Sequence, residues 1–374
     1  MKRLPVIVIL IALFFAVSPA WAKVVYVKSD SPGPLFDGTS WNTAFHSVQR
    51  GINAAVSGDE VWVAAGTYLE RITLMNGVEL YGGFSGSETE RGQRDSQTNV
   101  TVLNGQKGGS VVSARNLSAG LIDGFTIRDG SASGVYCSFS SIAITNNTII
   151  NNSTSSQGGG GIYCSGGYTT SPTITNNIIS DNIVGGIMCA GCSPVIVSNF
   201  ITRNTNVWNY DAGLSCDNVT VATIINNTIV GNSAQGIYCD RSTPTVVNNI
   251  VAYNRVGIYA SSSTLTLRNN CVYGNTNSNY SGTSAGADDI SEDPKLANGT
   301  YDVHIYPSSS CKDKGDNSVV QTGWADIDGD SRILPLPDGI VDIGADESDG
   351  RTYNYTGLVS FSPSAGVYTT GLTH

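Results

Sequence analysis

The chain has 374 residues, of which only 13% are charged, and its formal net charge is −10 at pH 7. These values argue against a nucleic-acid-binding protein, because nothing neutralises phosphates in bulk, and they leave neutral glycans and cations as partners. The abundance of Gly, Asn and β-branched residues disfavours a helical protein, whereas a hydrophobic content of 40% disfavours disorder.

The first 22 residues have the features of a secretory signal peptide. Lys2 and Arg3 form a basic start, residues 6–17 are almost purely apolar, and Ala20 and Ala22 form a small-x-small cleavage site. The apolar run is shorter than the about 20 residues that a membrane-spanning helix needs, and no second run of that length follows. We therefore expect a secreted or cell-surface protein with no transmembrane segment after signal removal.

The segment that follows is predicted to begin a coiled structure. A short helix is expected over about residues 44–55, followed by a first coil strand over residues 60–64. The helix would plug the open end of the core, since the ends of solenoids need caps. Residues 88–95 are charged, and we expect them to leave the coil as a loop or hairpin.

An asparagine-rich segment, ITNNTIINN at residues 144–152, returns at 174–182, 224–232 and 246–254. The second Asn of each pair and the Asn five residues later define two columns, Asn147, Asn177, Asn199, Asn227, Asn249, Asn270 and Asn152, Asn182, Asn204, Asn232, Asn254, Asn275. Gly124 and Asp129 fit the same register one unit earlier. A unit near 22 residues with occasional insertions predicts a solenoid, in which each coil buries its face against its neighbours.

A second column confirms this register. Each unit contains a Gly followed by an alternating strand, and these glycines are Gly134, Gly161, Gly186, Gly213, Gly236 and Gly257. No unit has room for a long amphipathic helix between its apolar runs. Short strands with Gly and Asn at the corners predict a parallel β-helix.

Three features make the chain resemble the right-handed parallel β-helix proteins of the pectin-lyase-like class. They are the Asn columns, the segment DGTSWNTAFHSVQRGINAAVSGDEVWVAAGTYLE at 37–70, and GVELYGGFSGSETERGQRDSQTNVTVLNG at 77–105. The resemblance implies an all-β right-handed solenoid over residues 23–312, in which inward-facing asparagines fill one corner. Buried Asn side chains satisfy corner backbone groups, so we expect the columns to be structural.

Five of the eight cysteines share one inward column: Cys137, Cys164, Cys189, Cys216 and Cys239. Parallel Cβ vectors do not converge, so we expect a ladder of free, buried thiols rather than disulfides. Cys189 and Cys192 form a CxxC that lacks a second ligand pair, and we interpret it as chance. Cys271 and Cys311 are candidates for a bridge between the last coil and the C-terminal cap.

The outward face of the same strands has tyrosines at coil spacing: Tyr136, Tyr163, Tyr238 and Tyr259. Aromatic faces at regular spacing suit the apolar faces of sugar rings, so these residues are the predicted glycan-binding set. Two other interpretations remain open. The tyrosines could be a cross-strand ladder that only stabilises the sheet, or they could be buried under the loops at 153–160 and 205–212.

Asp217 and Asp240 are predicted to lie side by side on that face, with Arg241 next in the chain. Neighbouring carboxylates either share a proton or bind a cation. The resemblance implies that, in an enzyme, these three residues would be catalytic in a polysaccharide lyase or glycoside hydrolase acting on uronate-rich glycans.

Other features of the sequence disfavour that activity. The Gly-His-Gly and Asn-Thr-Asp motifs of the related hydrolases are missing, no histidine lies in a coil strand, and Lys is absent from 108 to 294. Our first hypothesis is therefore a non-catalytic scaffold that displays a glycan- or partner-binding face. The extracellular lyase or hydrolase is the alternative.

The C-terminal stretch ADIDGDSRILPLPDGIVDIGADES (325–348) resembles the terminal motif of the same exported proteins, and we assign a cap motif to residues 313–350. Asp326, Asp328 and Asp330 alternate like the start of a calcium loop, although Gly329 is too early for an EF-hand. Calcium at these residues and a solvated acidic loop both remain open. The tail, residues 351–374, is predicted to be the start of a truncated β-sandwich domain or to be disordered.

Overall fold

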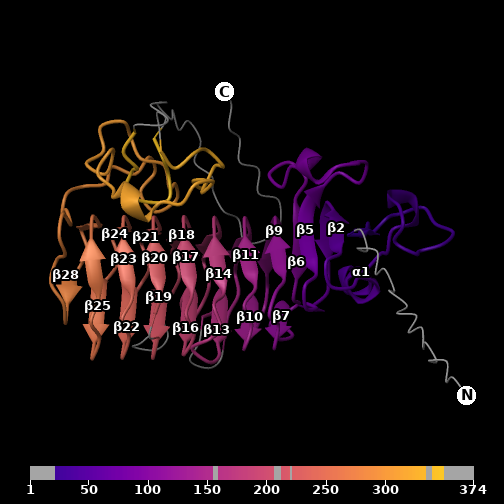
Figure 1. Ribbon diagram of the computed structural model, residues 1–374, viewed down its shortest axis with the longest axis horizontal. Coiled ribbons are helices and arrows are strands. Elements are labelled where there is room, and N and C mark those ends of the chain that lie inside the picture. The colour runs from indigo at the N-terminus through magenta and orange to yellow at the C-terminus, as the bar shows by residue number, and fades with distance from the viewer. Residues whose placement is uncertain (1–21, 155–158, 206–211, 220, 334–338, 349–374) are drawn as a thin grey trace, which may run out of the picture.

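The computed structural model describes residues 22–154, 159–205, 212–219, 221–333 and 339–348. The predicted signal peptide, apart from Ala22, and the tail at 351–374 lie outside this part of the chain. The described residues form the expected all-β solenoid, in which three parallel sheets run along the long axis (Figure 1). One α-helix, α1 (Val48–Ala54), lies near the N-terminal end.

The strands follow one another from sheet to sheet around each coil. Sheet A contains β1 (Val24–Val27), β2 (Glu60–Ala64), β5 (Glu79–Phe84), β8 (Leu121–Asp123), β11 (Ala143–Thr145), β14 (Thr173–Thr175), β17 (Val195–Val197), β20 (Thr223–Ile225), β23 (Thr245–Val247) and β26 (Thr266–Arg268). Sheet B contains β3 (Gly66–Tyr68), β6 (Thr101–Asn104), β9 (Phe125–Arg128), β12 (Thr148–Ile150), β15 (Ile178–Ser180), β18 (Phe200–Thr202), β21 (Thr228–Val230), β24 (Ile250–Ala252) and β27 (Cys271–Tyr273). Sheet C contains β4 (Ile72–Thr73), β7 (Val112–Arg115), β10 (Val135–Ser138), β13 (Ile162–Ser165), β16 (Ile187–Ala190), β19 (Ala212–Asp217), β22 (Gln235–Asp240), β25 (Val256–Ser261) and β28 (Ser278–Ser281).

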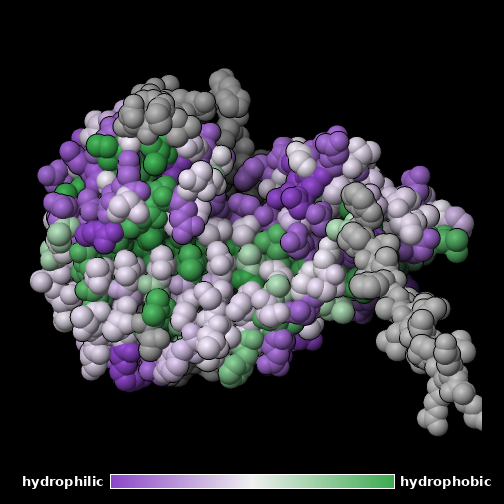
Figure 2. Space-filling model, in the orientation of Figure 1, coloured by the Kyte–Doolittle hydropathy of each residue, from purple (hydrophilic) through white to green (hydrophobic). Residues whose placement is uncertain are grey.

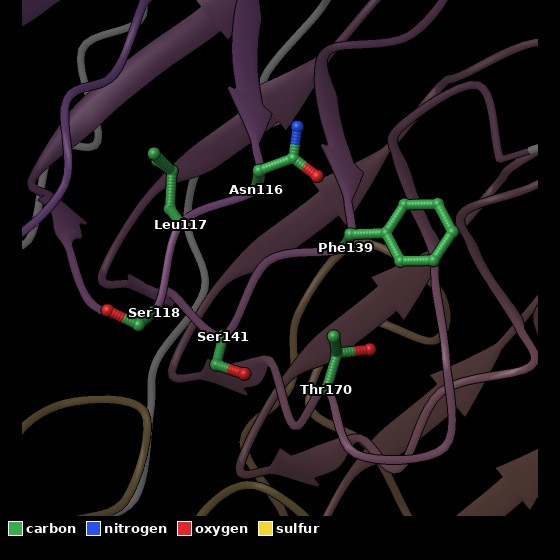
Figure 3. A pocket seen from close by; sticks show the side chains of 6 residues that line it. All are labelled: Asn116, Leu117, Ser118, Phe139, Ser141 and Thr170. Carbon is green, nitrogen blue, oxygen red and sulfur yellow. The ribbon is translucent and has the colours of Figure 1, made fainter.

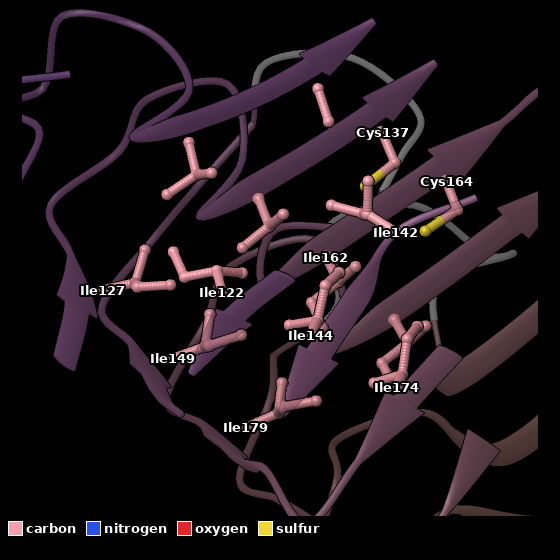
Figure 4. Packing of buried hydrophobic residues seen from close by; sticks show 14 of the residues in the cluster. Ile122, Ile127, Cys137, Ile142, Ile144, Ile149, Ile162, Cys164, Ile174 and Ile179 are labelled. Carbon is pink, nitrogen blue, oxygen red and sulfur yellow. The ribbon is translucent and has the colours of Figure 1, made fainter. Parts of the chain in front are cut away.

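Successive coils pair in register, so equivalent residues stack on one another. Val135 pairs with Ile162 and Cys137 with Cys164, as the repeat predicts. Inside the solenoid the isoleucines of sheets A and B form continuous stacks, such as Ile122, Ile144 and Ile174 (Figure 4). These side chains are fully buried, and they form the core against which every coil packs.

The asparagine columns are confirmed as two buried ladders. In the first, Asn147 Nδ2 donates to Asn177 Oδ1 at 3.1 Å and Asn177 Nδ2 donates to Asn199 Oδ1 at 3.0 Å. Each side chain also bonds the backbone. Asn199 Nδ2, for example, donates to the carbonyl of Ile174, and Asn199 Oδ1 accepts the backbone N–H of Asn177. The ladder ends at Asp289, which accepts from Asn270.

The first Asn of each pair has a different role. These residues adopt positive φ between 52° and 58°, a conformation that Asn tolerates better than most residues; they are Asn146, Asn176, Asn226, Asn248 and Asn269. All but Asn146 donate a side-chain hydrogen bond to the C-terminal segment. Asn176 Nδ2 donates to the carbonyl of Asp326 and Asn226 Nδ2 to that of Asp342. Both members of the repeated Asn-Asn pair are therefore explained.

Helix α1 closes the N-terminal end of the core, as expected, but it begins at Val48 rather than near residue 44. Ser47 is its N-cap, and the Glu70 carboxylate accepts the N–H groups of Val48 and Gln49. Residues 41–43 form a separate 3₁₀ turn, η1 (Trp41–Thr43). Strand β1 precedes the helix and pairs with β2, so β2 is the second strand of sheet A rather than the first coil strand.

Two segments leave the coils. Residues 85–100 form the expected charged loop, which contains the 3₁₀ turn η2 (Arg91–Gln93). The last strand ends at Ser281, and bridges from Arg268 to Ala287 and from Cys271 to Ile290 continue the coil for less than a turn. The coiled part thus ends earlier than the predicted residue 312.

Residues 291–333 and 339–348, which we call the cap, fold back over the outer face of sheet B above β18, β21 and β24 (Figure 1). Over these described residues the cap contains only the 3₁₀ turn η3 (Asn317–Val319) and short bridges. Its apolar residues, among them Ile305 and Ile343, pack on Phe200, Val230 and Ile250.

All eight cysteines are buried and free, which confirms the thiol ladder. Cys192 donates weakly to the carbonyl of Cys164 and belongs to the same core cluster. Cys271 and Cys311 lie in one cluster between the last coil and the cap, as thiols rather than as the predicted bridge. A hydrogen bond with Cys311, together with burial, raises the pKa of the Cys271 thiol.

Candidate functional site

The tyrosines of sheet C form two stacked pairs. Tyr136 pairs with Tyr163 and their ring centroids are 5.6 Å apart, while Tyr238 pairs with Tyr259 at 5.5 Å. The strands force this spacing, because equivalent residues of neighbouring coils lie about 4.8 Å apart. Met188 and Ser215 separate the two pairs in the same column.

The four tyrosines are not equally accessible. Tyr136, Tyr163 and Tyr259 are half-buried, whereas Tyr238 is only 7% exposed. The loops named as covers, 153–160 and 205–212, lie largely outside the described residues. A ligand on this face would contact the first pair and Tyr259.

Arg115 is a member of this surface that the sequence analysis did not identify. It ends β7 one coil before Ser138, and its guanidinium carbon lies 4.5 Å from the centroid of the Tyr136 ring. Such a cation–π contact fixes the ring and places a hydrogen-bond donor beside it. The register offered a signal, because Arg115 pairs with Ser138, which lies two residues after Tyr136 on the same face of the strand.

At the corner after β7 and β10 the surface is hollowed into an open depression of about 340 Å³. Figure 3 shows its lining, to which the turns of three coils contribute: Asn116, Leu117, Ser118, Phe139, Ser141 and Thr170. The Phe139 side chain is 58% exposed and stands at the rim of the depression. Tyr168, on the next turn, is 51% exposed and accepts a hydrogen bond from Asn218.

The predicted acid pair lies further along the same face. Asp217 and Asp240 are directly paired between β19 and β22, which confirms their expected adjacency. Arg241 bridges them, with one guanidinium nitrogen 2.6 Å from Asp217 and the other 2.6 Å from Asp240. The cation that neighbouring carboxylates require is therefore supplied by the chain itself, in the form of Arg241.

The acidic loop of the cap does not gather its three carboxylates at one point. Asp326 is fully buried, and its two oxygens accept the N–H groups of Asp328, Asp330 and Glu347. The Asp328 side chain turns instead to His304, whose Nε2 is 2.7 Å from Asp328 Oδ2. Asp330 is exposed.

His304 and Asp346 are site residues that the sequence analysis missed. One ligand atom each of His304, Asp328 and Asp346 lies within 4.8 Å of the other two. Burial raises the pKa of Asp346 to about 7. Burial alone would lower the pKa of His304, but its hydrogen bonds to Asp302 and Asp328 raise it to about 11.

On the face seen in Figure 2 the flank of the coils is largely pale, whereas strongly hydrophilic residues gather on the N-terminal loops and on the cap. No helix among the described residues is long and apolar enough to cross a membrane.

Comparisons with known proteins agree with this architecture. A family model described as "Right handed beta helix region" matches residues 38–201 and 111–272. The crystal structure of pectate lyase Pel9A superposes with a TM-score of 0.51 and 14% identity, covering 88% of this chain and 97% of that one. Pectin methylesterase PemA from Erwinia chrysanthemi gives 0.35 and 13%, covering 73% and 93%. A comparison with curated proteins gives no match, and at these identities the structural likeness concerns the fold alone.

Proposed function

The chain belongs to the right-handed β-helix family, and on this premise we propose that it is an exported, non-catalytic scaffold that binds a polysaccharide or cell-surface glycan. The binding surface is the outer face of sheet C around Tyr136, Tyr163 and Arg115, extended by the corner depression. The pair of half-buried tyrosine rings 5.6 Å apart on a rigid sheet is the observation that supports this proposal best.

The chemistry of the surface suits an extended carbohydrate. Sugar rings present apolar C–H faces that pack on aromatic rings, and hydroxyl groups that need donors and acceptors at the rim. Tyr136 and Tyr163 supply the aromatic area, while Arg115 supplies donors. Because the sheet is fixed by the coils on either side, binding requires little ordering of the protein.

The acid pair contributes to recognition in this proposal rather than to catalysis. A general acid or a nucleophile must reach the scissile bond, but both carboxylates are ion-paired to Arg241. The guanidinium side chain is 59% exposed, so it remains available to a carboxylate of a uronate-containing glycan.

Retention on glycan-containing native gels tests the proposal. Pectate, alginate and neutral plant glycans would be cast into separate gels, and the full chain compared with Tyr136→Ala and Tyr163→Ala. We expect one glycan class to retard the wild type, and each substitution to weaken retention about two- to tenfold, since one aromatic contact contributes about 0.5–1.5 kcal/mol beyond its buried area.

Tyr306→Ala is the matched control, because this tyrosine is exposed on the cap. It should migrate like the wild type in every gel. Equal retention of Tyr136→Ala, Tyr163→Ala and the control, with unchanged circular dichroism, would remove the tyrosine surface from the proposal.

An extracellular polysaccharide lyase or hydrolase acting on uronate-rich glycans is the second candidate. The direct pairing of Asp217 with Asp240, beside the basic Arg241, is the observation in its favour. A lyase would release unsaturated products that absorb in the ultraviolet, and a hydrolase would release reducing ends. Product formation that disappears in Asp240→Asn, and that persists in Tyr136→Ala, would favour this candidate over the scaffold.

A further inference from the structure

Three segments of the cap meet at His304. The first is the 302–305 segment itself, the second is the acidic turn that holds Asp328, and the third is the 341–348 segment that holds Asp346. The Ile305 N–H donates to Asp346 Oδ2 at 2.9 Å, which ties the first segment to the third. The described residues of the cap form no helix or sheet apart from one 3₁₀ turn and short bridges. A cross-link at this junction would therefore stabilise the cap.

The junction contains an unsatisfied buried acceptor. Asp346 is 1% exposed, and its Oδ1 has no hydrogen-bond partner among the described residues. An unpaired carboxylate oxygen in the interior is costly, and native proteins ordinarily satisfy it with a donor or a cation. This oxygen belongs to a residue whose ligand atom is within 4.8 Å of those of His304 and Asp328.

The surroundings are also rich in negative charge. Asp326, Asp342 and Glu347 are buried near Asp346, and Arg332 is the fully buried cation that faces them. Arg332 Nη2 is occupied by the carbonyls of Asp342 and Gly344, and it lies 3.7 Å from Glu347. Arg332 and His304 are thus the cations that face this cluster, and the acidic groups around them outnumber them.

His304 has the arrangement of a metal-ligating histidine. Its Nδ1 is hydrogen-bonded to Asp302, which fixes the ring, and its Nε2 points to Asp328. A carboxylate on one ring nitrogen orients the other nitrogen toward a metal ion in many protein sites. We propose that His304, Asp328 and Asp346 form a divalent metal site in the cap, with Asp302 as its positioning residue.

The ligand set favours a particular class of ion. One imidazole with two carboxylates suits a first-row transition ion such as Zn²⁺ or Mn²⁺ better than Ca²⁺, which prefers oxygen ligands alone. Ligands about 2.1 Å from a tetrahedral Zn²⁺ lie about 3.4 Å apart, so atoms already within 4.8 Å need only small movements. The Asp328 side chain is 44% exposed, which gives the ion an entry path and room for a water ligand.

The ion would replace the proton on His304 Nε2 and separate that nitrogen from Asp328. It would also satisfy the Asp346 oxygen and join the three segments of the cap. The site would then be structural, and independent of the glycan surface on sheet C.

Titration of the metal-free full chain with Zn²⁺, Mn²⁺ and Ca²⁺ tests the proposal, with calorimetry and thermal melting as the readouts. We expect one Zn²⁺ or Mn²⁺ per chain, and a rise in Tm when the ion is present. Asp328→Asn and Asp346→Asn should each weaken binding by about tenfold or more, and Asp302→Asn by about ten- to a hundredfold.

Asp330→Asn is the matched control in the same acidic turn, and its affinity should stay within about twofold of the wild type. Asp328→Asn keeps the test valid if Asp346→Asn fails to fold, because Asp328 is partly exposed. Absence of Zn²⁺ and Mn²⁺ binding to the wild type would overturn the proposal, leaving His304 as an ion-paired imidazolium. Calcium binding that is lost in Asp330→Asn would overturn it in favour of the acidic loop.

Discussion

At the scale of single residues, the asparagine ladders show how a polar side chain becomes a core residue. Each ladder Asn donates to the next one along the axis and to a backbone carbonyl, and accepts a backbone N–H from the coil before it. Asn is the residue that offers an acceptor and two donors on so short a side chain. The corner therefore loses water without losing hydrogen bonds.

Replacing Asn199 with Ala should be strongly destabilising. The change leaves the Asn177 N–H without its acceptor, and it removes the Asn199 Nδ2 donor from the carbonyl of Ile174 and the Asn199 Oδ1 acceptor from Asn177 Nδ2, all in the interior. Each unpaired buried group costs about 1–3 kcal/mol, so we expect a loss of about 3–5 kcal/mol in the free energy of unfolding. Urea unfolding monitored by circular dichroism measures it.

Asn53→Ala provides the comparison, because Asn53 lies on the exposed side of α1, where its side chain accepts a hydrogen bond from Gln49. Its unfolding free energy should stay within about 0.5 kcal/mol of the wild type. A cost for Asn199→Ala no greater than that of Asn53→Ala would contradict the ladder as a stabilising element.

The eight buried cysteines predict a second behaviour of single residues. Thiols that are inaccessible do not react with Ellman's reagent, so the native protein should show no fast-reacting sulfur. After unfolding in guanidinium chloride, all eight should react. A count of six would show that one disulfide forms under oxidising conditions. If the Cys271→Ser, Cys311→Ser double variant, which keeps the other six cysteines, also gives a count of six, the bridge is assigned to this pair.

Repeated residues could be predicted from the sequence, and unique ones could not. Once the repeat period is known, equivalent residues of successive coils can be aligned in the sequence. This alignment predicts the Asn ladders, the thiol ladder, the tyrosine pairs and the pairing of Asp217 with Asp240. His304 and Asp346 belong to no column, and only the path of the cap brings them together. The partner of the acid pair, Arg241, was next in the chain, but its bridging geometry depends on its side-chain conformation.

At the scale of elements, the glycine column allows the backbones of neighbouring coils to approach closely at the start of the sheet C strands. A Cβ on Gly186 would lie 2.5 Å from the carbonyl oxygen of Gly213 and 2.9 Å from Ile201 Cγ2. A Cβ on Gly161 would likewise lie 2.5 Å from the carbonyl oxygen of Gly186. That carbonyl accepts the N–H of Ile162, so the close approach is part of the sheet. The column seen in the sequence is thus a packing requirement.

Gly186→Ala should therefore destabilise the protein, because the new methyl group meets backbone that cannot move independently. Overpacking of this kind costs about 1–3 kcal/mol. Gly92→Ala is the matched control, since Gly92 has open space around its Cα and no positive φ. Thermal melting should show a lower Tm for Gly186→Ala alone. Equal Tm values for the two variants would contradict the packing argument.

The start of α1 shows where an element escaped prediction. The apolar spacing around residues 44–55 is compatible with one helix, but Ser47 and Glu70 satisfy the first N–H groups of a helix that begins at Val48. Glu70 is distant in sequence, so its capping role was not visible. Residues 41–43 tighten instead into a 3₁₀ turn capped by Ser40.

At the scale of the whole molecule, the solenoid is a one-dimensional stack whose interior is closed at the N-terminal end by α1 and whose sheet B is covered by the cap. The stack was predictable because each coil repeats the same pattern. A cap motif was predicted at residues 313–350, but no repeated pattern in the sequence indicated that it docks on sheet B. Its docking uses the outward Asn residues, such as Asn248, whose carbonyl accepts the Gly344 N–H and whose side chain bonds Asp316.

Removal of the cap should therefore convert the outer face of sheet B into an association surface. A chain that ends at Ile290 keeps Asp289 at the end of the Asn ladder and the bridges on the last strands, but exposes the apolar cluster of Phe200, Val230, Ile250, Ala252 and Cys271. Exposed contiguous apolar area drives association, so this chain should bind a hydrophobic dye and elute as oligomers in light-scattering chromatography. A chain that ends at Ser348 keeps the cap and should remain monomeric without dye binding. If both chains are monomeric, the outer face of sheet B does not need the cap to stay soluble. Packing of Ile305 and Ile343 on that face would then not be what prevents association.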